Sequence, residues 1–518
     1  MNLNRKLWWA QHKSNVYKYG TILSLVLIVT ISIIYFTYSK FSSRNEATAY
    51  ETTVEPFIKN DYFIASYIDG EWSDNIPGKS DGYEVDKIVC DNGATGTWNN
   101  EEWGINIRNA TKKTKCSVYF EPRLDIDVEL AQGMIPVKFD DSGNVVVADT
   151  STKWYNYKTH EWANAVLVNC ADSAIKSKYF DSNNNVLASA VGKTISMDEI
   201  MQMYVYIPRY KYQLFNAEDG TSVEQAINIT FESKTKVKST GTKNGEWLTH
   251  PAFTFGDKEL AGIWVGKFET SNTSELPKIV PNVSSLRDMN VSAQFNTSRL
   301  MTTTLASTYG ASTNDDSHMM KNMEWGAVAY LSSSIYGRYT NASTCIDSGC
   351  EVWINNNLSY TTGCAGSSVS ASSASTCNAW NTSTGVNAST TGNIYGIYDM
   401  SGGAWEYVMG NYNDTIGNYA GFSSMPEAKY YDKYTGTDSN SDFTKYHLGD
   451  ATKETLKTKS KGSNAWYGDS SYSVYSSNPW VGRGGSYYNS STTGVFDFLT
   501  RIGNSSGDGS FRVVLGAL

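Results

Sequence analysis

An uncharged apolar stretch near the N-terminus constrains this chain most, because it decides where everything after it can fold. The segment from Tyr19 to Ser39 contains no charged residue. It is long enough to cross a hydrocarbon core of roughly 30 Å as a helix. Four basic residues precede it, between Arg5 and Lys18, and no acidic residue occurs before Glu46. The positive-inside rule then keeps the N-terminus in the cytoplasm and exports the rest.

This pattern predicts a single-pass protein of the cell membrane with its bulk outside the cell. It divides the N-terminal region into a cytoplasmic stub (1–18), a transmembrane signal anchor (19–41) and a short polar linker (42–56). A cleaved signal peptide is the alternative. It is disfavoured because the apolar run is too long and the nearest small-x-small site, Ala47 to Ala49, lies too far downstream.

All seven cysteines follow the predicted anchor, where an exported chain can oxidise them. Cys90 and Cys116 lie in one small domain and form the most natural pair. A second group lies in a Ser/Thr-rich stretch, where one or two disulfides would fasten a long loop. A zinc site is less favoured, because the group contains no His and no CxxC spacing. Cys170 is left over as a buried free thiol. The clustered cysteines are Cys345, Cys350, Cys364 and Cys377.

Composition argues against a nucleic-acid partner. The net charge is -9, only 18% of residues are charged, and no basic patch follows the predicted anchor. Tyr, Ser, Asn, Thr and Gly dominate the second half of the chain, a mixture typical of β-rich folds and of adaptable contact surfaces.

Two domains are predicted beyond the linker. Residues 57–121 contain short strand-like runs separated by Gly, Asn and Pro, which indicates a small all-β domain. Residues 125–518 combine short strands, a few helices and long loops, which predicts an irregular α+β domain. Within it, the Cys/Ser/Thr-rich stretch 343–392 is interpreted as an insertion.

The segment YGIYDMSGGAWEYVMGNY, residues 395–412, places Asp399 and Glu406 on either side of the Gly402-Gly403 pair. Two carboxylates at this spacing could form an acid/base pair, a metal site or the support of a tight turn. An acid/base pair is disfavoured, since nothing else in the sequence indicates a sugar or peptide cleft.

Four segments, in order, resemble motifs of the formylglycine-generating enzyme family, whose fold is C-type-lectin-like. IWVGKFETS resembles the strand before the family's Glu-Val-Thr, and NMEWGAVAYL resembles its Glu-Trp-Glu-Tyr-Ala helix. Residues 395–412 resemble its Gly-Leu-Tyr-Asp-Met-x-Gly-Asn-Val-Trp-Glu-Trp. The segment GRGGSYYNSS...SFRVVL resembles its Arg-Gly-Gly-Ser-Trp and Gly-Phe-Arg-Val.

The resemblance implies a structural calcium ion at the glycine turn. The implied ligands are the carboxylates of Asp399 and Glu406 and the carbonyl oxygens of Gly402 and Ala404, a donor set that suits a hard cation. Gly403 departs from the family, which has Asn there. The alternative is a turn held by hydrogen bonds with no ion.

The same resemblance argues against the family's oxidase activity, so no enzyme and no copper are expected. That chemistry needs two thiols after the Gly-Gly-Ser segment. Asn489 and Gly494 stand at the corresponding positions. The five histidines also lack the spacing of the three-His iron site of related enzymes.

The last segment resembles the variable proteins of diversity-generating retroelements, which scatter exchangeable residues over a C-terminal ligand site. This implies a bacterial surface protein that binds an extracellular protein or glycan through a lectin-like face. The alternatives are a sulfatase-modifying enzyme and a fixed structural or adhesion protein of the envelope. The candidate variable positions are Tyr487, Tyr488, Asn489, Ser490, Ser491, Thr492, Asp497, Leu499, Thr500, Arg501 and Asn504.

Overall fold

The computed structural model describes two compact units, which divide between Leu124 and Asp125. The described residues are 63–68, 70–72, 76–79, 83–111, 114–218, 220–339 and 349–516, with His12, Lys13 and Asn15 near the N-terminus.

The first unit is an antiparallel sheet with the strand order β2-β1-β6-β3, beside the hairpin β4–β5. Its core contains Ala65, Val118 and Phe120, against which the partly buried Trp98 and Trp103 pack. These tryptophans therefore serve the core. The strands are β1 (Phe63–Ile68), β2 (Glu71–Trp72), β3 (Tyr83–Cys90), β4 (Thr95–Asn99), β5 (Gly104–Arg108) and β6 (Lys115–Pro122).

A seven-stranded sheet forms the middle of the second unit, with the order β19-β27-β16-β10-β9-β7-β8. Every residue of the central strand β10 is buried, including Gln202, and the mostly apolar sequence is typical of such a strand. The strands are β7 (Ile135–Phe139), β8 (Val145–Val147), β9 (Asn164–Val168), β10 (Ile200–Pro208), β16 (Gly262–Gly266), β19 (Asp316–Met319) and β27 (Val513–Gly516).

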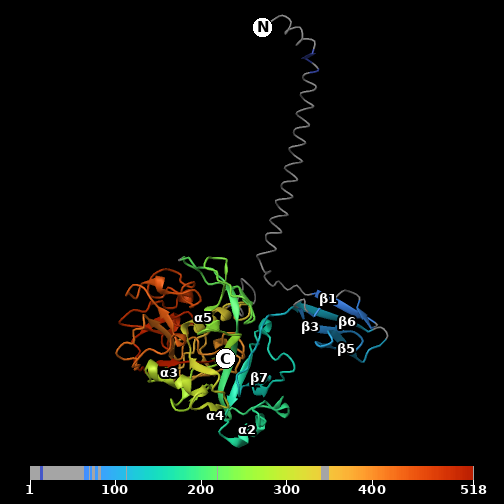
Figure 1. Cartoon of the computed structure of the whole chain (residues 1–518), viewed down its shortest axis with the longest axis horizontal. Helices are drawn as coiled ribbons and strands as arrows, with labels where there is room; N and C mark the ends of the chain where they lie inside the picture. The colour runs from blue at the N-terminus through green and yellow to red at the C-terminus, as the bar shows by residue number, and fades with distance from the viewer. Residues whose placement is uncertain are drawn as a thin grey trace. The chain divides into compact units, whose positions relative to one another are not determined.

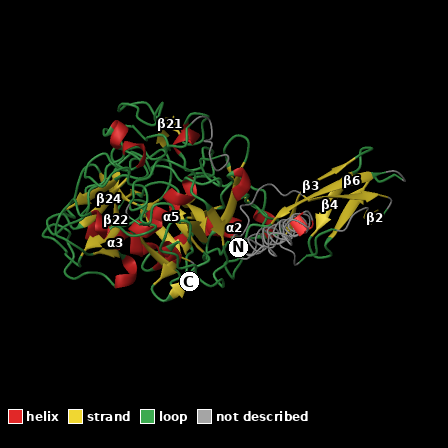
Figure 2. Cartoon of the chain, turned by 90° about the horizontal axis from the view of Figure 1, so that it is seen from above, coloured by secondary structure: helices red, strands yellow, loops and turns green. Residues whose placement is uncertain are grey.

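A five-stranded sheet carries the C-terminal segments, with the order β23-β22-β24-β25 and β26 also paired to β22. In Figure 1 these orange and red segments gather on the side of the unit away from β7, and Figure 2 shows β22 and β24 together beside α3. The strands are β22 (Trp405–Tyr412), β23 (Asp432–Tyr434), β24 (Trp480–Arg483), β25 (Phe498–Arg501) and β26 (Gly509–Phe511).

Smaller pairings complete the second unit. A three-stranded sheet has the order β12-β11-β13, and three short hairpins stand apart from the larger sheets. The strands are β11 (Tyr210–Gln213), β12 (Ile229–Phe231), β13 (Trp247–Thr249), β14 (Thr254–Phe255), β15 (Lys258–Glu259), β17 (Ser271–Asn272), β18 (Pro277–Lys278), β20 (Cys364–Ala365) and β21 (Asn378–Ala379).

The expectation of an α+β fold is wrong, because strands and long loops make up most of the described chain and its helices are short. The longest described helix, α5, has 11 residues, all of them buried. The Asn290 side chain caps α3 by accepting a hydrogen bond from the N–H of Ala293. The helices are α2 (Ser173–Tyr179), α3 (Val291–Arg299), α4 (Ala306–Tyr309) and α5 (Asn322–Ser332).

The expected membrane location is also corrected. Among the described residues, no helix combines the length and the apolar composition that a bilayer crossing requires. This finding runs against the expectation of a single-pass protein of the cell membrane with a transmembrane helix. The segment predicted as the anchor, 19–41, and the linker, 42–56, lie outside the described residues.

Candidate ligand-binding face

The glycine turn before β22 connects three distant parts of the chain. Gly402 and Gly403 both have a positive φ, 77° and 72°. The N–H of Gly402 donates to the carbonyl of Gly484 (3.0 Å), and the N–H of Gly403 donates to the carbonyl of Asn355 (2.7 Å). The carbonyl of Gly403 accepts from the N–H of Tyr487 (2.9 Å). The turn therefore positions both the insertion and the start of the predicted variable segment.

Asp399 is buried at the start of this turn and accepts hydrogen bonds from the insertion. Its carboxylate oxygens lie 2.9 and 3.1 Å from the N–H of Gly363, and one of them lies 2.8 Å from the amide Nδ2 of Asn355. Burial raises the pKa of Asp399, and the Arg512 charge and these hydrogen bonds offset only part of that effect. Its role is to fasten the insertion to the turn.

Glu406 on β22 forms an ion pair with Arg512, and both side chains are completely buried. One oxygen of Glu406 lies 2.5 Å from Nη2 of Arg512, and the other lies 3.2 Å from Nε. Arg512 also donates to the carbonyls of Gly266 and Tyr398. Burial raises the pKa of Glu406 to about 7 even though Arg512 lowers it. The pair joins β22 to the strand that contains Gly266.

Glu269 is a third buried carboxylate at this turn, and sequence reasoning missed it. Its Oε1 accepts the N–H of Ala404 (2.9 Å), and a Cβ placed at Gly403 would overlap that oxygen. Burial, then the charges of Asp399 and Glu406, raise the pKa of Glu269 well above its usual value. Glu269 lies in IWVGKFETS, one of the four segments that resemble the enzyme family, and this position could have marked it as a candidate residue of the turn.

The two carboxylates implied as calcium ligands are bound by other groups in this structure. The oxygens of Glu406 accept from the Arg512 guanidinium, and those of Asp399 accept from N–H groups. A hard cation needs oxygen donors with free lone pairs that converge on one point. Over the described ranges, no group of three or more His, Cys, Asp or Glu side chains is placed to hold a metal. A guanidinium and N–H donors hold the turn in this structure.

The predicted variable segment covers a surface, which we call the C-terminal face. It runs from β24 through a turn and a short 3-10 helix (Ser490–Thr492) to β25. Every predicted position except Asp497 is at least partly exposed, and Tyr488 is 53% exposed. The framework residues beneath are buried: Arg483, Gly484, Gly485, Gly494, Phe496, Phe511 and Arg512.

Asp497 does not belong to that face, because its side chain is 1% exposed. Burial, then the neighbouring charge of Asp469, raise the pKa of Asp497 well above its usual value. Residues just before β25 turn inward, which no local pattern in the sequence indicated. Asp497 is therefore a buried residue of the framework.

Residues 489 and 494, where oxidase chemistry would need thiols, have structural roles instead. The Asn489 side chain accepts the N–H of Ser486 (2.9 Å) and so shapes the turn. A Cβ placed at Gly494 would overlap the carboxylate of Asp469, whose Oδ2 also accepts the N–H of Phe496 (2.9 Å). The fold leaves no space for a cysteine side chain at residue 494.

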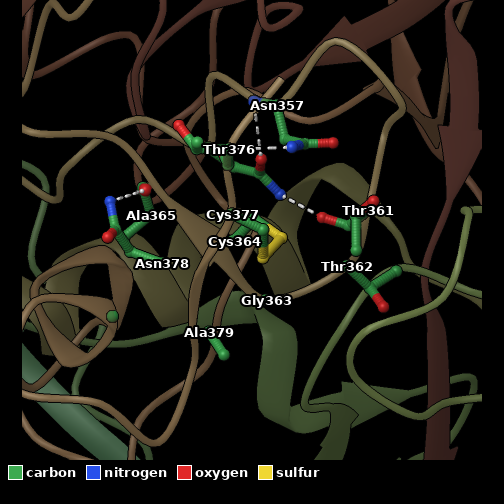
Figure 3. The surroundings of a disulfide bond; sticks show 12 residues. Asn357, Thr361, Thr362, Gly363, Cys364, Ala365, Thr376, Cys377, Asn378 and Ala379 are labelled. Atoms are coloured by element: carbon green, nitrogen blue, oxygen red, sulfur yellow. Dashed lines mark hydrogen bonds between the residues drawn. A yellow bond between two sulfur atoms is a disulfide. The ribbon is translucent and has the colours of Figure 1, made fainter. Parts of the chain in front are cut away.

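The insertion lies against the C-terminal face. The hydroxyl of Ser490 donates to the carbonyl of Ser370 (2.9 Å). A Cys364–Cys377 disulfide closes the loop that contains Ser370. Figure 3 shows this disulfide between the hydrogen bonds of Asn357 and of Asn378, which tie the two arms of the loop together. The sequence placed the insertion as a separate loop, whereas it forms part of the face.

The other cysteines are accounted for as follows. A Cys90–Cys116 disulfide joins β3 to β6 in the first unit. Cys170 is buried and free. Cys350 is disulfide-bonded, and Cys345 lies outside the described residues.

A buried histidine joins β19 to α5 away from the face. His318 Nδ1 lies 2.8 Å from Asp316, and Nε2 lies 2.9 Å from Glu324. Burial alone would lower the pKa of His318, but Glu324 and then Asp316 raise it to about 9. His160 bonds the carbonyl of Gly337 through Nδ1 (2.6 Å), so its contact is structural.

No protein-family model matches the sequence, and no curated protein matches it. The structure is similar to that of Treponema denticola variable protein 1, at 10% sequence identity and a TM-score of 0.24, over 62% of this chain and 98% of that chain. A TM-score this low does not establish a shared fold, so membership of the formylglycine-generating enzyme family is not shown.

Proposed function

We propose that this chain is a non-enzymatic binding protein that holds a protein or glycan ligand on its C-terminal face. The observation that carries the proposal is the separation of two residue sets within one short segment. Tyr488 and Ser491 are exposed and the other predicted positions except Asp497 are partly exposed, whereas the framework residues Arg483, Gly494 and Phe496 are buried. Tyr supplies large contact area at low entropy cost, and Ser and Asn supply adaptable hydrogen bonds.

The framework gives this face a fixed backbone on which side chains can change. Arg483 donates to Asn322 (2.7 Å) and to the carbonyl of Asp497 (3.1 Å), so it ties β24 to α5 and to the start of β25. The indole N–H of Trp325 donates to the carbonyl of Val495 (2.7 Å). The first contact joins two of the segments that resemble the enzyme family, the one that contains Asn322 and the one that contains Arg483. We therefore infer that the outward residues are exchangeable, as in a diversified receptor.

An enzyme that modifies sulfatases is the rival function, and the crowded position at Gly494 speaks against it. A fixed structural protein is the second rival. A fixed structural protein predicts that the outward residues of the C-terminal face are no more important for binding than the rest of the surface.

Randomising the exposed positions of the C-terminal face in one library, displayed as the full chain, tests the proposal. We expect most members to keep a cooperative melting transition, because these side chains support no core. A matched library at the buried framework positions should lose that transition. Loss of folding in the first library would place its residues in the core and contradict the proposal.

A further inference from the structure

Four segments of the chain contact one another in a closed circuit at the edge of the C-terminal face. The rings of Tyr487 and Tyr488 lie edge to face with centroids 5.4 Å apart, and Tyr360 of the insertion packs against Tyr487 at 4.8 Å. The Arg287 guanidinium lies 3.9 Å from the centre of the Tyr360 ring. These contacts join the insertion to the predicted variable segment through aromatic side chains.

Asp508 completes this circuit of contacts. The hydroxyl of Tyr488 donates to its carboxylate (2.7 Å), as does the hydroxyl of Ser506. Arg287 donates to the carbonyl of the adjacent Gly507. Against its partial burial, the hydrogen bonds from Ser506 and Tyr488 lower the pKa of Asp508. The carboxylate is therefore ionised and holds Tyr488 in place.

Tyr360 has a backbone conformation that bulky residues rarely adopt, with φ 54°. Such a residue persists only where its surroundings fix it, and these residues gather at binding sites. The N–H of Tyr360 donates to the carbonyl of Asn357 (3.0 Å), and its own carbonyl accepts from Ser285 (3.0 Å). The insertion thus presents the Tyr360 ring in one orientation.

Two arginines at this place form no close ion pair within the described ranges, although the charge of Arg501 lowers the pKa of the neighbouring Asp508. The ion pairs of arginine in the described ranges include those of Arg209, Arg299 and Arg512. Arg287 stacks on Tyr360, and the Arg501 guanidinium lies 4.3 Å from the centre of the Trp405 ring. In a chain of net charge -9, such positive groups can pair with carboxylates of a partner.

Aliphatic side chains lie beside the aromatic ring as well. Val283 is 39% exposed and Leu358 is 47% exposed. Val283 precedes Arg287 and Leu358 precedes Tyr360 in sequence. The N–H of Thr362 donates to the carbonyl of Val283 (2.8 Å), and the N–H of Val283 donates to the hydroxyl of Thr362 (3.4 Å), so the two segments are joined. Tyr and Arg are enriched at surfaces that bind proteins, and the exposed aliphatic groups add apolar area that a peptide side chain can cover.

We propose that the insertion and the C-terminal face form one composite site, and that its partner is a polypeptide segment presenting carboxylate side chains next to apolar ones. Tyr360 and Tyr488 are its aromatic anchors, and Arg287 and Arg501 receive the carboxylates. This inference rests on the proposed function, to which it adds the insertion and the class of ligand.

The test uses a phage-displayed library of random peptides selected on the full chain. A selected peptide is then synthesised, and its Kd is measured for the wild type and for Tyr360→Ala and Tyr488→Ala. Tyr431→Ala is the matched control, because the Tyr431 hydroxyl also donates to a carboxylate, that of Asp414 (2.7 Å). We expect selected peptides to be rich in Asp, Glu and apolar residues. Each anchor variant should weaken binding about tenfold or more, and the control should not.

Carboxamide versions of the peptide, with Asp and Glu changed to Asn and Gln, test the arginines without altering the protein. They should lose affinity for the wild type, and the double variant Arg287→Gln, Arg501→Gln should no longer distinguish them from the parent peptide. Equal affinity of both peptides for the wild type would contradict the proposal that the arginines receive carboxylates of the partner.

The outcomes separate this inference from the proposed function. If Tyr488→Ala weakens binding and Tyr360→Ala does not, the C-terminal face binds without the insertion and the composite site is wrong. If neither variant changes the Kd, the peptide binds elsewhere and both proposals fail. A selection that enriches no peptide also contradicts a polypeptide ligand.

Discussion

Gly403 occupies a position where a side chain would fit neither the backbone nor the space. Its φ is 72°, and a Cβ would overlap Glu269. We expect Gly403→Ala to lower the free energy of unfolding of the second unit by roughly 3 kcal/mol, from backbone strain and overpacking together. Gly245→Ala is the control, because Gly245 has a similar φ of 85° in open space. It should cost about 1 kcal/mol. Equal losses in chemical denaturation would show that the contact with Glu269 is unimportant.

Glu406 and Arg512 are expected to matter as a buried pair. Removing one partner leaves an uncompensated charge in the core, so Glu406→Ala should cost about 3–5 kcal/mol. The exposed pair of Lys433 and Asp414 is the control, and Lys433→Ala should cost less than about 1 kcal/mol. Calcium or a chelator should leave the melting temperature unchanged. A calcium-dependent rise that Glu406→Ala abolishes would contradict a turn held by Arg512.

At the scale of elements, the disulfide-closed loop supports the insertion. In the chain-entropy model, a Cys364→Ser, Cys377→Ser double variant should lose about 3 kcal/mol. The amide of Gly363, which donates to Asp399 (2.9 Å), should exchange hydrogen faster. The Cys90→Ser, Cys116→Ser variant is the control, since that disulfide lies in the first unit. Unchanged exchange at Gly363 after loss of Cys364–Cys377 would show that Asp399 alone fixes the insertion.

The contact between β19 and α5 should make stability depend on pH. The folded pKa of His318 is raised to about 9 from 6.5 by Glu324 and Asp316. Its contribution is therefore complete below about pH 6.5 and is lost as pH rises through about 9, a change of up to roughly 3 kcal/mol. Denaturation of the wild type and of His318→Gln at pH 6 and pH 9 measures it. The variant should be less stable at pH 6 and vary less with pH; identical slopes would rule out this role.

Local chemistry in the sequence anticipated some of these elements and missed others. Asp399 and Glu406 stood out because carboxylates beside a glycine pair are rare among apolar residues, but their partners could not be read locally. Arg512 lies 106 residues from Glu406 in sequence, and Tyr360 reaches Tyr487 from within the insertion. Asp497 was placed outward because it is a polar residue beside a framework residue, Phe496, in a segment where framework and polar residues alternate. Contacts between distant segments decide all three cases.

Over the whole molecule, the second unit separates a buried framework from a surface of adaptable side chains. Arg483, Gly485 and Asp497 are fixed by burial, whereas Tyr488 and Ser491 are exposed. This separation lets the face change while the fold stays the same. The Cys90–Cys116 disulfide of the first unit and the Cys364–Cys377 disulfide of the second fit a chain that folds in an oxidising environment.

Sequencing the 3′ end of this gene across a population that carries it tests the central claim most directly. The account predicts that amino-acid differences concentrate at the exposed positions of the C-terminal face between residues 487 and 504. Asp497 and the framework residues Arg483, Gly485 and Gly494 should remain constant. An invariant 3′ end, or differences that fall equally on the buried framework, would contradict a face whose side chains are exchangeable.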